Sequence, residues 1–212
     1  MSLIMKKQKL KIVYQESKLQ QFNLMGISFA DLTTLSTDIV DEIFDATQRM
    51  FEKYPALKGS LVKYEVKFLK PSTIASTHCE FINGKAQYTI YFNSLIWIFG
   101  NIRKTIKENY SSNFLATKTI AGIVYHEIGH VINGLLISKT KLTINDFAYD
   151  WNNKIFAECL LNQYGIKKAI IEKISAYALK SYAESFAEIF AAYHENISIP
   201  KECKQMIGDL VF

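Results

Sequence analysis

Residues 119–137, TIAGIVYHEIGHVINGLLI, form the longest mostly apolar stretch of the chain. The stretch predicts a helix over about Thr117–Leu136 that lies in the core of the fold. Its length also approaches that of a membrane span, which needs about 20 apolar residues. A site inside a membrane needs several spans to shield its polar groups, and no second stretch approaches the required length. We therefore expect a core helix and no membrane span.

Length and composition predict one globular domain over residues 1–212. Apolar residues make up 49% of the chain and charged residues 21%, as in most soluble globular proteins. The three cysteines are widely spaced and form no C-x-x-C pair, which favours reduced thiols in a cytosolic protein. Residues 1–11 are charged and lack the apolar core of a cleavable export signal. We expect a cytoplasmic protein, with unconventional export or an incomplete chain as alternatives.

The basic charge of the chain is almost entirely lysine. Its net charge of +5 comes from 23 lysines and only two arginines. Proteins that recognise phosphates or bases usually rely on the forked guanidinium of arginine, which is scarce here. The basic run between Lys6 and Lys11 is expected to be a solvated tail, with a nucleic-acid-binding arm as the alternative. The composition therefore predicts no nucleic-acid partner.

The order of elements predicts an α+β fold with its strands confined to the N-terminal half. Residues 1–30 are expected to be an irregular lead-in, about 31–137 an α+β lobe, and about 138–212 a helical lobe. The expected elements are a helix over Thr37–Tyr54, a strand over Leu61–Leu69, a hairpin of 80–82 with 87–92 closed by Asn83-Gly84, helical structure from Asn93 to about Glu108, a connecting segment over Ile137–Asn152, helices over Lys154–Tyr164 and Lys167–Glu195 with a break near Ser175–Ser181, and a short helix after Pro200.

The apolar helix contains the motif His126-Glu127-Ile128-Gly129-His130. A shuffled chain of this composition would contain such a motif in roughly 0.7% of cases, so the motif is stronger evidence than most short pattern matches. The spacing places both imidazoles on one helix face. Two neutral imidazoles so placed can share one Zn²⁺, while Glu127 reaches a water molecule on the metal. The alternative is a pair of histidines on a buried face that bond to backbone or water.

A catalytic zinc site needs a third protein ligand and an open position for water. The metzincin arrangement places a third histidine six residues after the second, where this chain has Leu136. His78 and His194 lie in no ligand spacing and are expected to be ordinary surface or core histidines. A glutamate from a later helix is the other common solution. The downstream candidates are Glu158, Glu172, Glu184, Glu188 and Glu195.

Among these candidates, the segment 182–193, YAESFAEIFAAY, is distinctive. Glu184 and Glu188 share one helix face, and the alanines of the segment allow a close approach to a neighbouring helix. Phe186 and Phe190 indicate that the helix is largely buried, where a carboxylate is costly unless it is paired, hydrogen-bonded or metal-bound. A metal with supporting hydrogen bonds would explain both carboxylates. The alternative is that they face solvent and pair with lysines.

The first motif, followed 54 residues later by Glu184-Ser185-Phe186-Ala187-Glu188-Ile189-Phe190, resembles the catalytic domains of the anthrax lethal factor type. This gluzincin group includes the Pro-Pro endopeptidases, and similar domains occur in bacterial and phage proteins. Its second motif reads approximately Glu-Phe-Phe-Ala-Glu-x-Phe, from which this chain departs only at Ser185. The resemblance spans about residues 117–195. It implies a zincin-like fold with a small N-terminal mixed sheet and a helical C-terminal subdomain.

The resemblance also implies a role for each matched residue. The zinc ligands would be His126, His130 and Glu184. Glu127 would be the general base of peptide-bond hydrolysis, and Glu188 would support the site from outside the ligand set. Tyr177, seven residues before the glutamate ligand, would stabilise the transition state, with Tyr182 as a rival for that role.

The expected activity is therefore that of a zinc-dependent endopeptidase, with Zn²⁺ as cofactor and a peptide or protein as substrate. Tyr88–Phe92 is expected to be an edge strand that pairs with the substrate backbone. The alternative is a non-catalytic zinc-binding protein, such as a structural or interaction component of a phage or other mobile element. Against it, a purely structural site does not need Glu127, and structural zinc usually has four protein ligands.

Overall fold

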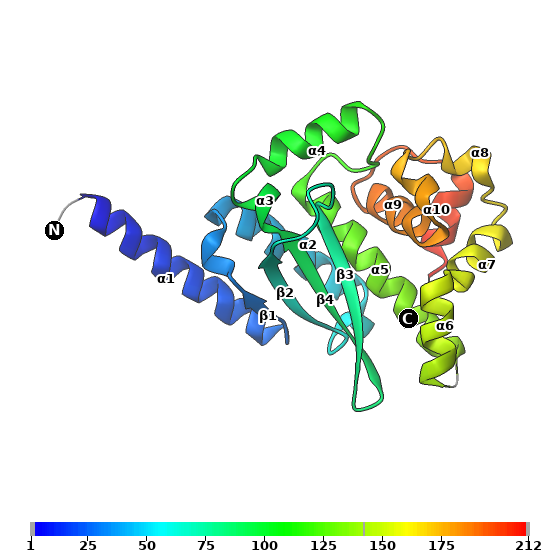
Figure 1. The fold of residues 1–212 in the computed structure, drawn as a ribbon, viewed down its shortest axis with the longest axis horizontal. Coiled ribbons are helices and arrows are strands. Elements are labelled where there is room, and N and C mark those ends of the chain that lie inside the picture. The colour runs from blue at the N-terminus through cyan, green and yellow to red at the C-terminus, as the bar shows by residue number, and fades with distance from the viewer. Residues whose placement is uncertain (1–2, 142, 211–212) are drawn as a thin grey trace.

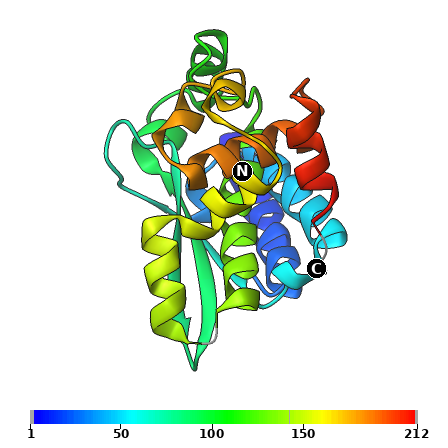
Figure 2. The same cartoon turned by 90° about the vertical axis from the view of Figure 1, so that its right-hand side faces the viewer.

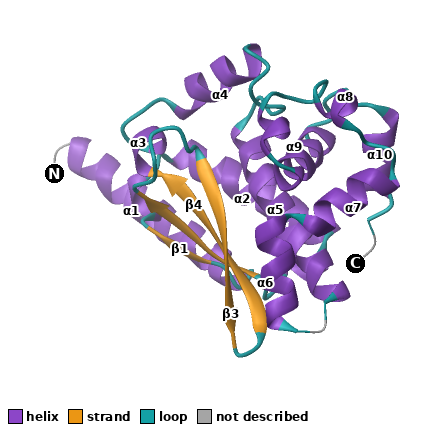
Figure 3. Cartoon of the chain, turned by 45° about the vertical axis from the view of Figure 1, so that its right-hand side comes forward, coloured by secondary structure: helices purple, strands orange, loops and turns teal. Residues whose placement is uncertain are grey.

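A computed structural model describes residues 3–141 and 143–210, with side chains from residue 11 onward. The N-terminal half holds a four-stranded mixed sheet with helices, and the rest is largely helical (Figures 1 and 3). This arrangement confirms the α+β order predicted from the sequence. Lys11 is exposed, as predicted for the basic run, whereas the side chains of Lys6, Lys7 and Lys9 lie outside the described part of the chain.

The sheet combines parallel pairs with one antiparallel hairpin. Its strands are β1 Ser28–Ala30, β2 Leu61–Lys67, β3 Ala75–Ile82 and β4 Lys85–Asn93. The spatial order is β1-β2-β4-β3, and only β3 and β4 run antiparallel. The predicted hairpin is confirmed, because Asn83 and Gly84 connect β3 to β4 with positive φ angles of 52° and 77°. Such angles are those of a two-residue hairpin turn.

The prediction that Tyr88–Phe92 forms an edge strand is wrong. These residues belong to β4, which pairs with β2 on one side and β3 on the other. Tyr88, Ile90 and Phe92 are fully buried on one face of the sheet. The alternation of apolar and polar residues shows which side chains of a strand face the core, but it does not show which strands pair with it. The open edge beside the motif helix belongs to β3.

Two predicted helices pack in the core next to the sheet, α2 Thr37–Lys53 and α5 Ile120–Thr140. α2 buries an apolar stripe and is tied to β2 where the hydroxyls of Thr47 and Tyr64 lie 2.7 Å apart. α5 is the predicted motif helix and extends a turn further than expected. By length and composition α5 could also cross a membrane, but 78% of its most apolar window is buried inside the fold.

The first 30 residues differ from the expected irregular lead-in. They form a long helix, α1 Leu3–Leu24, followed by β1. The N-terminal end of α1 extends away from the rest of the molecule (Figure 1), so the helix needs no continuous apolar stripe. It joins the core through its later turns, where Phe22 is fully buried and the Gln15 amide donates to the Leu35 carbonyl at 3.1 Å.

The predicted connecting segment Ile137–Asn152 is also mostly helical. α5 continues to Thr140, and a further helix, α6 Ile144–Asn153, follows. Thr143 caps α6 by accepting a hydrogen bond from the Asp146 amide at 3.1 Å. Figure 2 shows α6 beside the hairpin of β3 and β4. The ring centroids of Phe147 on α6 and Phe81 on β3 lie 4.9 Å apart. The sequence contained a helical signal here, because Ile144, Phe147, Ala148 and Trp151 follow the Thr143 cap at helical spacing.

The other helices follow the predicted order with shorter segments. They are α3 Ser94–Trp97, α4 Ile102–Ser111, α7 Ile155–Gln163, α8 Lys168–Ile171, α9 Tyr182–His194 and α10 Lys201–Gly208. The predicted break near Ser175–Ser181 is confirmed, and it contains a 3₁₀ turn, Tyr177–Lys180. Ser181 then caps α9 by accepting from the Glu184 amide at 3.2 Å. The break thereby sets where α9 begins.

Candidate metal centre

Helix α5 carries both histidines of the motif on one face. Its start is fixed by the N-cap residue Thr119 and by Glu195 at the end of α9, whose carboxylate accepts from the Thr119 hydroxyl and the Lys118 amide. A negative charge at this end also suits the helix dipole. His126 and His130 follow within the helix, one turn apart, and their Nε2 atoms lie 3.3 Å from each other.

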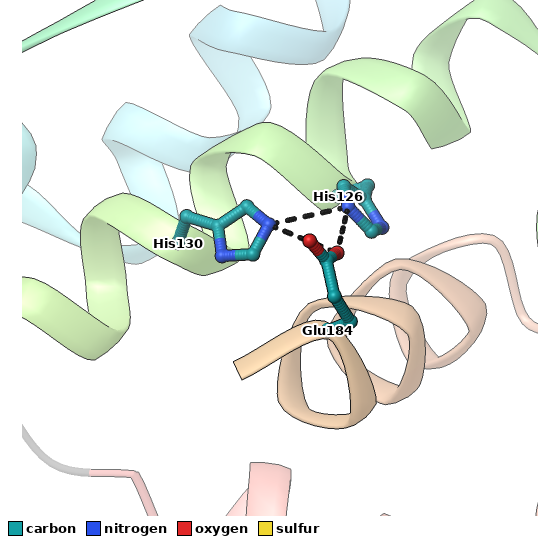
Figure 4. Close-up of side chains that lie close together, drawn as sticks. All are labelled: His126, His130 and Glu184. Carbon is teal, nitrogen blue, oxygen red and sulfur yellow. Dashed lines mark hydrogen bonds and ion pairs between the residues drawn. The ribbon is translucent and has the colours of Figure 1, made fainter. Parts of the chain in front are cut away.

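Helix α9 approaches α5 closely enough to bring a carboxylate to these rings. A Cβ atom at Gly129 would lie only 3.0 Å from the Ala187 Cα, so glycine and alanine together permit the contact. The Glu184 Oε2 atom then lies 3.1 Å from the Nε2 of His126 and 3.3 Å from that of His130 (Figure 4). Two nitrogens and one oxygen thus form a small triangle between the helices.

The three atoms form a group that could hold a metal ion. The Glu184 Oε2 atom is buried, and the two imidazoles that face it at 3.1 and 3.3 Å make no hydrogen bond of good geometry with it. A cation between the three groups would stabilise such a carboxylate oxygen, which is costly to bury without a well-placed partner. Burial alone would raise the pKa of Glu184. The facing rings of His130 and His126 outweigh that effect and hold the pKa well below its usual range.

Glu188 binds the far side of the His126 ring. It is fully buried, and its Oε1 lies 2.8 Å from the His126 Nδ1. Its Oε2 accepts from the Ser175 hydroxyl at 2.7 Å and from the Ala116 amide at 2.5 Å. A carboxylate at Nδ1 keeps the proton on that nitrogen and directs the Nε2 lone pair into the triangle. Burial lowers the pKa of His126, but the facing carboxylates of Glu184 and Glu188 raise it well above the usual value.

Glu127 lies in a small pocket beside the same ring. It is 4% exposed, and the pocket is lined by His126, Tyr177 and apolar side chains that include Ile74. On β3, the Thr77 hydroxyl lies 2.7 Å from the Glu127 Oε2 and 3.0 Å from its backbone oxygen. Burial raises the pKa of Glu127 by more than the nearby histidines and Thr77 lower it, so the pKa is raised overall. This carboxyl is therefore a weaker acid than a solvated one.

The two candidate tyrosines occupy different places. Tyr177 is half-buried in the pocket with Glu127, and its ring centroid lies 5.8 Å from that of His126. Burial, followed by the charges of nearby carboxylates, raises the pKa of its phenol. Tyr182 is 38% exposed and faces Glu158, whose charge and hydrogen bond raise the pKa of this second phenol. The structure thus brings Tyr177, and not Tyr182, next to the metal-binding group.

The other histidines lie away from the triangle. His78 is exposed on β3, with its Nε2 3.3 Å from the Glu80 carboxylate. His194 is half-buried near the end of α9, where its Nε2 lies 3.0 Å from the Tyr54 hydroxyl. Burial and the charge of Lys53 lower the pKa of His194 to about 3. The first is a surface histidine and the second packs in the core, as the spacing suggested.

Two side chains of the site carried no signal in the sequence. Thr77 reaches Glu127 only because the β3 strand lies alongside α5, and nothing local to Thr77 indicates that contact. Ser175 lies in the predicted break and reaches Glu188 because the chain folds back there, with the Ala176 amide bonded to the Asn113 carbonyl at 2.8 Å. Both contacts join segments far apart in the chain, so only the fold reveals them.

Comparisons of the chain with protein-family models, with curated proteins and with solved structures gave no match. The structure unites two imidazoles and a carboxylate from two helices, and it places a second carboxylate and a phenol in the adjoining pocket.

Proposed function

We propose that this chain is a zinc-dependent endopeptidase of the gluzincin type. The observation that carries the proposal is the triangle of His126, His130 and Glu184 with the Glu127 carboxylate in the pocket beside it. A metal-binding group and a buried proton acceptor next to one another are the two parts that metal-assisted hydrolysis requires. The substrate would be a peptide or protein.

Zinc fits the donor atoms of the triangle. Bonds of about 2.0–2.2 Å in a tetrahedral arrangement place neighbouring donors about 3.3–3.5 Å apart. The observed separations of 3.1, 3.3 and 3.3 Å are close to that spacing. Two imidazoles with one carboxylate form a common ligand set for catalytic zinc, and three protein ligands leave a fourth position for water. The Glu184 Oε2 atom, which has no hydrogen bond of good geometry, would gain a cationic partner in this arrangement.

The residues around the triangle would divide the chemistry. Zinc held there would supply Lewis acidity that activates water and polarises the scissile carbonyl. Glu127 would take the proton of the attacking water and deliver it to the leaving amine. Because Thr77 donates to Oε2, the Oε1 atom of Glu127 is the oxygen left to accept that proton. The phenol of Tyr177, kept protonated by its raised pKa, would donate to the carbonyl oxygen as it gains charge.

The resemblance to the lethal factor type supports the same assignment. Glu184 and Glu188, the two carboxylates of the second motif, lie on α9 and contact opposite nitrogens of the His126 ring. These are the positions that a zinc ligand and its supporting carboxylate would take. The proposal therefore agrees with the resemblance and with the geometry of the residues taken alone.

A non-catalytic zinc protein is the competing proposal, and two observations count against it. Within the described residues, the metal-binding group has three members, whereas structural zinc usually has four protein ligands. Glu127 is also buried beside the group with a raised pKa, which a purely structural site does not require.

Zinc content and peptide cleavage test the proposal together. Purified protein should hold about one zinc per chain by elemental analysis, and Glu184→Ala should lose most of it. A proteome-derived peptide library should be cleaved by the wild type and left intact by Glu127→Gln, with zinc retained. Full activity in Glu127→Gln would disprove the mechanism. Zinc binding without any cleavage by the wild type would favour the non-catalytic alternative.

A further inference from the structure

A basic cavity lies beside the start of α9, separate from the pocket of Glu127. It is bounded by α7, α8, the 3₁₀ turn and the first residues of α9. Three exposed lysines, Lys167, Lys168 and Lys180, line it. The Ser181 hydroxyl, which accepts from the Glu184 amide, adds a hydrogen-bond donor to the same wall. The cavity thus combines several cations with polar groups.

The positive charge of this cavity has no counter-charge within it. Among the described residues, no carboxylate lines the cavity, and none of the three lysines forms an ion pair. Glu158, which lies outside the lining of the cavity, acts on the Tyr182 phenol and raises its pKa. Like charges grouped without partners repel one another and produce a local positive potential. An anionic ligand would complement that potential.

Lys180 links the basic cavity to the pocket of Glu127. Its Nζ lies 4.0 Å from the Tyr177 ring centroid and 5.2 Å from that of Phe114, so two aromatic faces hold the cation. Both rings line the pocket that contains His126 and Glu127. A chain that left this pocket past Tyr177 would therefore meet Lys180 first and then the other lysines.

We propose that the substrate is acidic on the side of the scissile bond that passes Tyr177, and that Lys180, Lys167 and Lys168 bind its carboxylates. The inference rests on the proposed peptidase function and specifies its substrate class. Electrostatic complementarity of this kind acts mainly on specificity and on the rate of association. Lys180 is then a specificity-determining residue, and its charge sets which peptides bind.

A binding experiment tests the charge preference without any cleavage. The protein is zinc-loaded Glu127→Gln, and the probes are two fluorescent peptides of equal length, one with three glutamates and one with three lysines. We expect the acidic peptide to bind more tightly. Adding Lys180→Glu should weaken its binding by about 5- to 10-fold, since an attractive ion pair becomes a repulsive one. Lys173→Glu, the same change at an exposed lysine outside the cavity, should have little effect.

Cleavage of a degenerate peptide library by the wild type separates the possible failures. Enrichment of Asp and Glu on one side of the cut, lost or reversed in Lys180→Glu but not in Lys173→Glu, supports the inference. Cleavage without enrichment of Asp and Glu overturns the inference and leaves the peptidase function intact. The same holds if the enrichment is unchanged in Lys180→Glu. Zinc binding with no cleavage of any peptide overturns the peptidase function, and the substrate class with it. Melting temperatures of the variants check that each one is folded.

Discussion

Two buried carboxylates flank His126, and they differ in how completely they are bonded. Both oxygens of Glu188 are bonded, to the His126 ring, the Ser175 hydroxyl and the Ala116 amide. Glu127 lines the pocket, and one of its oxygens accepts from Thr77, whereas the other has no hydrogen bond among the described residues. A carboxylate with all its partners in place holds a ring in position, whereas a free oxygen with a raised pKa can exchange a proton. On the proposed function, this difference gives Glu188 the role of positioning the His126 ring and Glu127 the role of proton transfer.

Replacing Glu127 should separate activity from stability. Glu127→Gln keeps the shape of the side chain but cannot accept a proton, so kcat/KM should fall by about 100- to 10,000-fold. Zinc content and melting temperature should change little, because removing a buried charge leaves no partner charge stranded. Peptide cleavage, elemental analysis and thermal unfolding check the three parts. A loss of zinc comparable to the loss of activity would contradict the division of roles.

Replacing Glu188 should instead lower the stability of the fold and the affinity for zinc. Glu188→Ala strands the His126 Nδ1–H, the Ser175 hydroxyl and the Ala116 amide in the core, which should cost about 3–5 kcal/mol of unfolding free energy. Zinc affinity should also fall, by about 10- to 100-fold, because the ligand ring loses its support. Urea unfolding and zinc titration measure the two effects. Glu188→Gln, which keeps most of the volume, should be less harmful in both.

Replacing Thr77 tests whether its hydrogen bond to Glu127 matters for activity. Thr77→Val has nearly the same shape but removes the hydrogen bond that orients Glu127. We expect kcat to fall roughly 10-fold, as for a lost hydrogen bond to a charged group, with KM and zinc content almost unchanged. Thr77→Ser, which retains a hydroxyl, should recover most of the activity. Equal losses in the valine and serine variants would mean that packing, and not the hydrogen bond, explains the effect.

The smallest expected effect concerns protons released when zinc binds. In the metal-free protein the pKa of His126 is raised well above 6.5, so this ring carries a proton at pH 7 that zinc must displace. Calorimetry in buffers of different ionisation enthalpy should show about one proton released per zinc at pH 7. Zinc affinity should weaken as the pH falls. Glu188→Gln should release less, because one of the carboxylates that raise the pKa of His126 is gone.

Periodic features and the residues matched by the motif resemblance could be predicted, whereas the other contacts between distant segments could not. Helical spacing places His126 and His130 on one face, and burial of α9 makes Glu184 a plausible partner for them. The contact of Thr77 with Glu127 depends on where the hairpin lies against α5, which no local pattern encodes. α6 is a different case, because the Thr143 cap and the helical spacing of Phe147 and Trp151 already indicate a helix. Local periodicity thus predicts elements and faces, while tertiary packing decides neighbours.

The antiparallel contact between α5 and α9 has a consequence for metal exchange. Glu195 fastens the far end of α9 to the start of α5, and Gly129 packs against Ala187 between that point and Glu184. None of these contacts involves the three candidate ligands, so the two helices should stay docked whether or not a metal is bound. On the proposed function, a metal would then enter a preorganised site without refolding of the two helices. Chelation should therefore be reversible, and a spectroscopic ion such as Co²⁺ should enter the native fold in place of zinc.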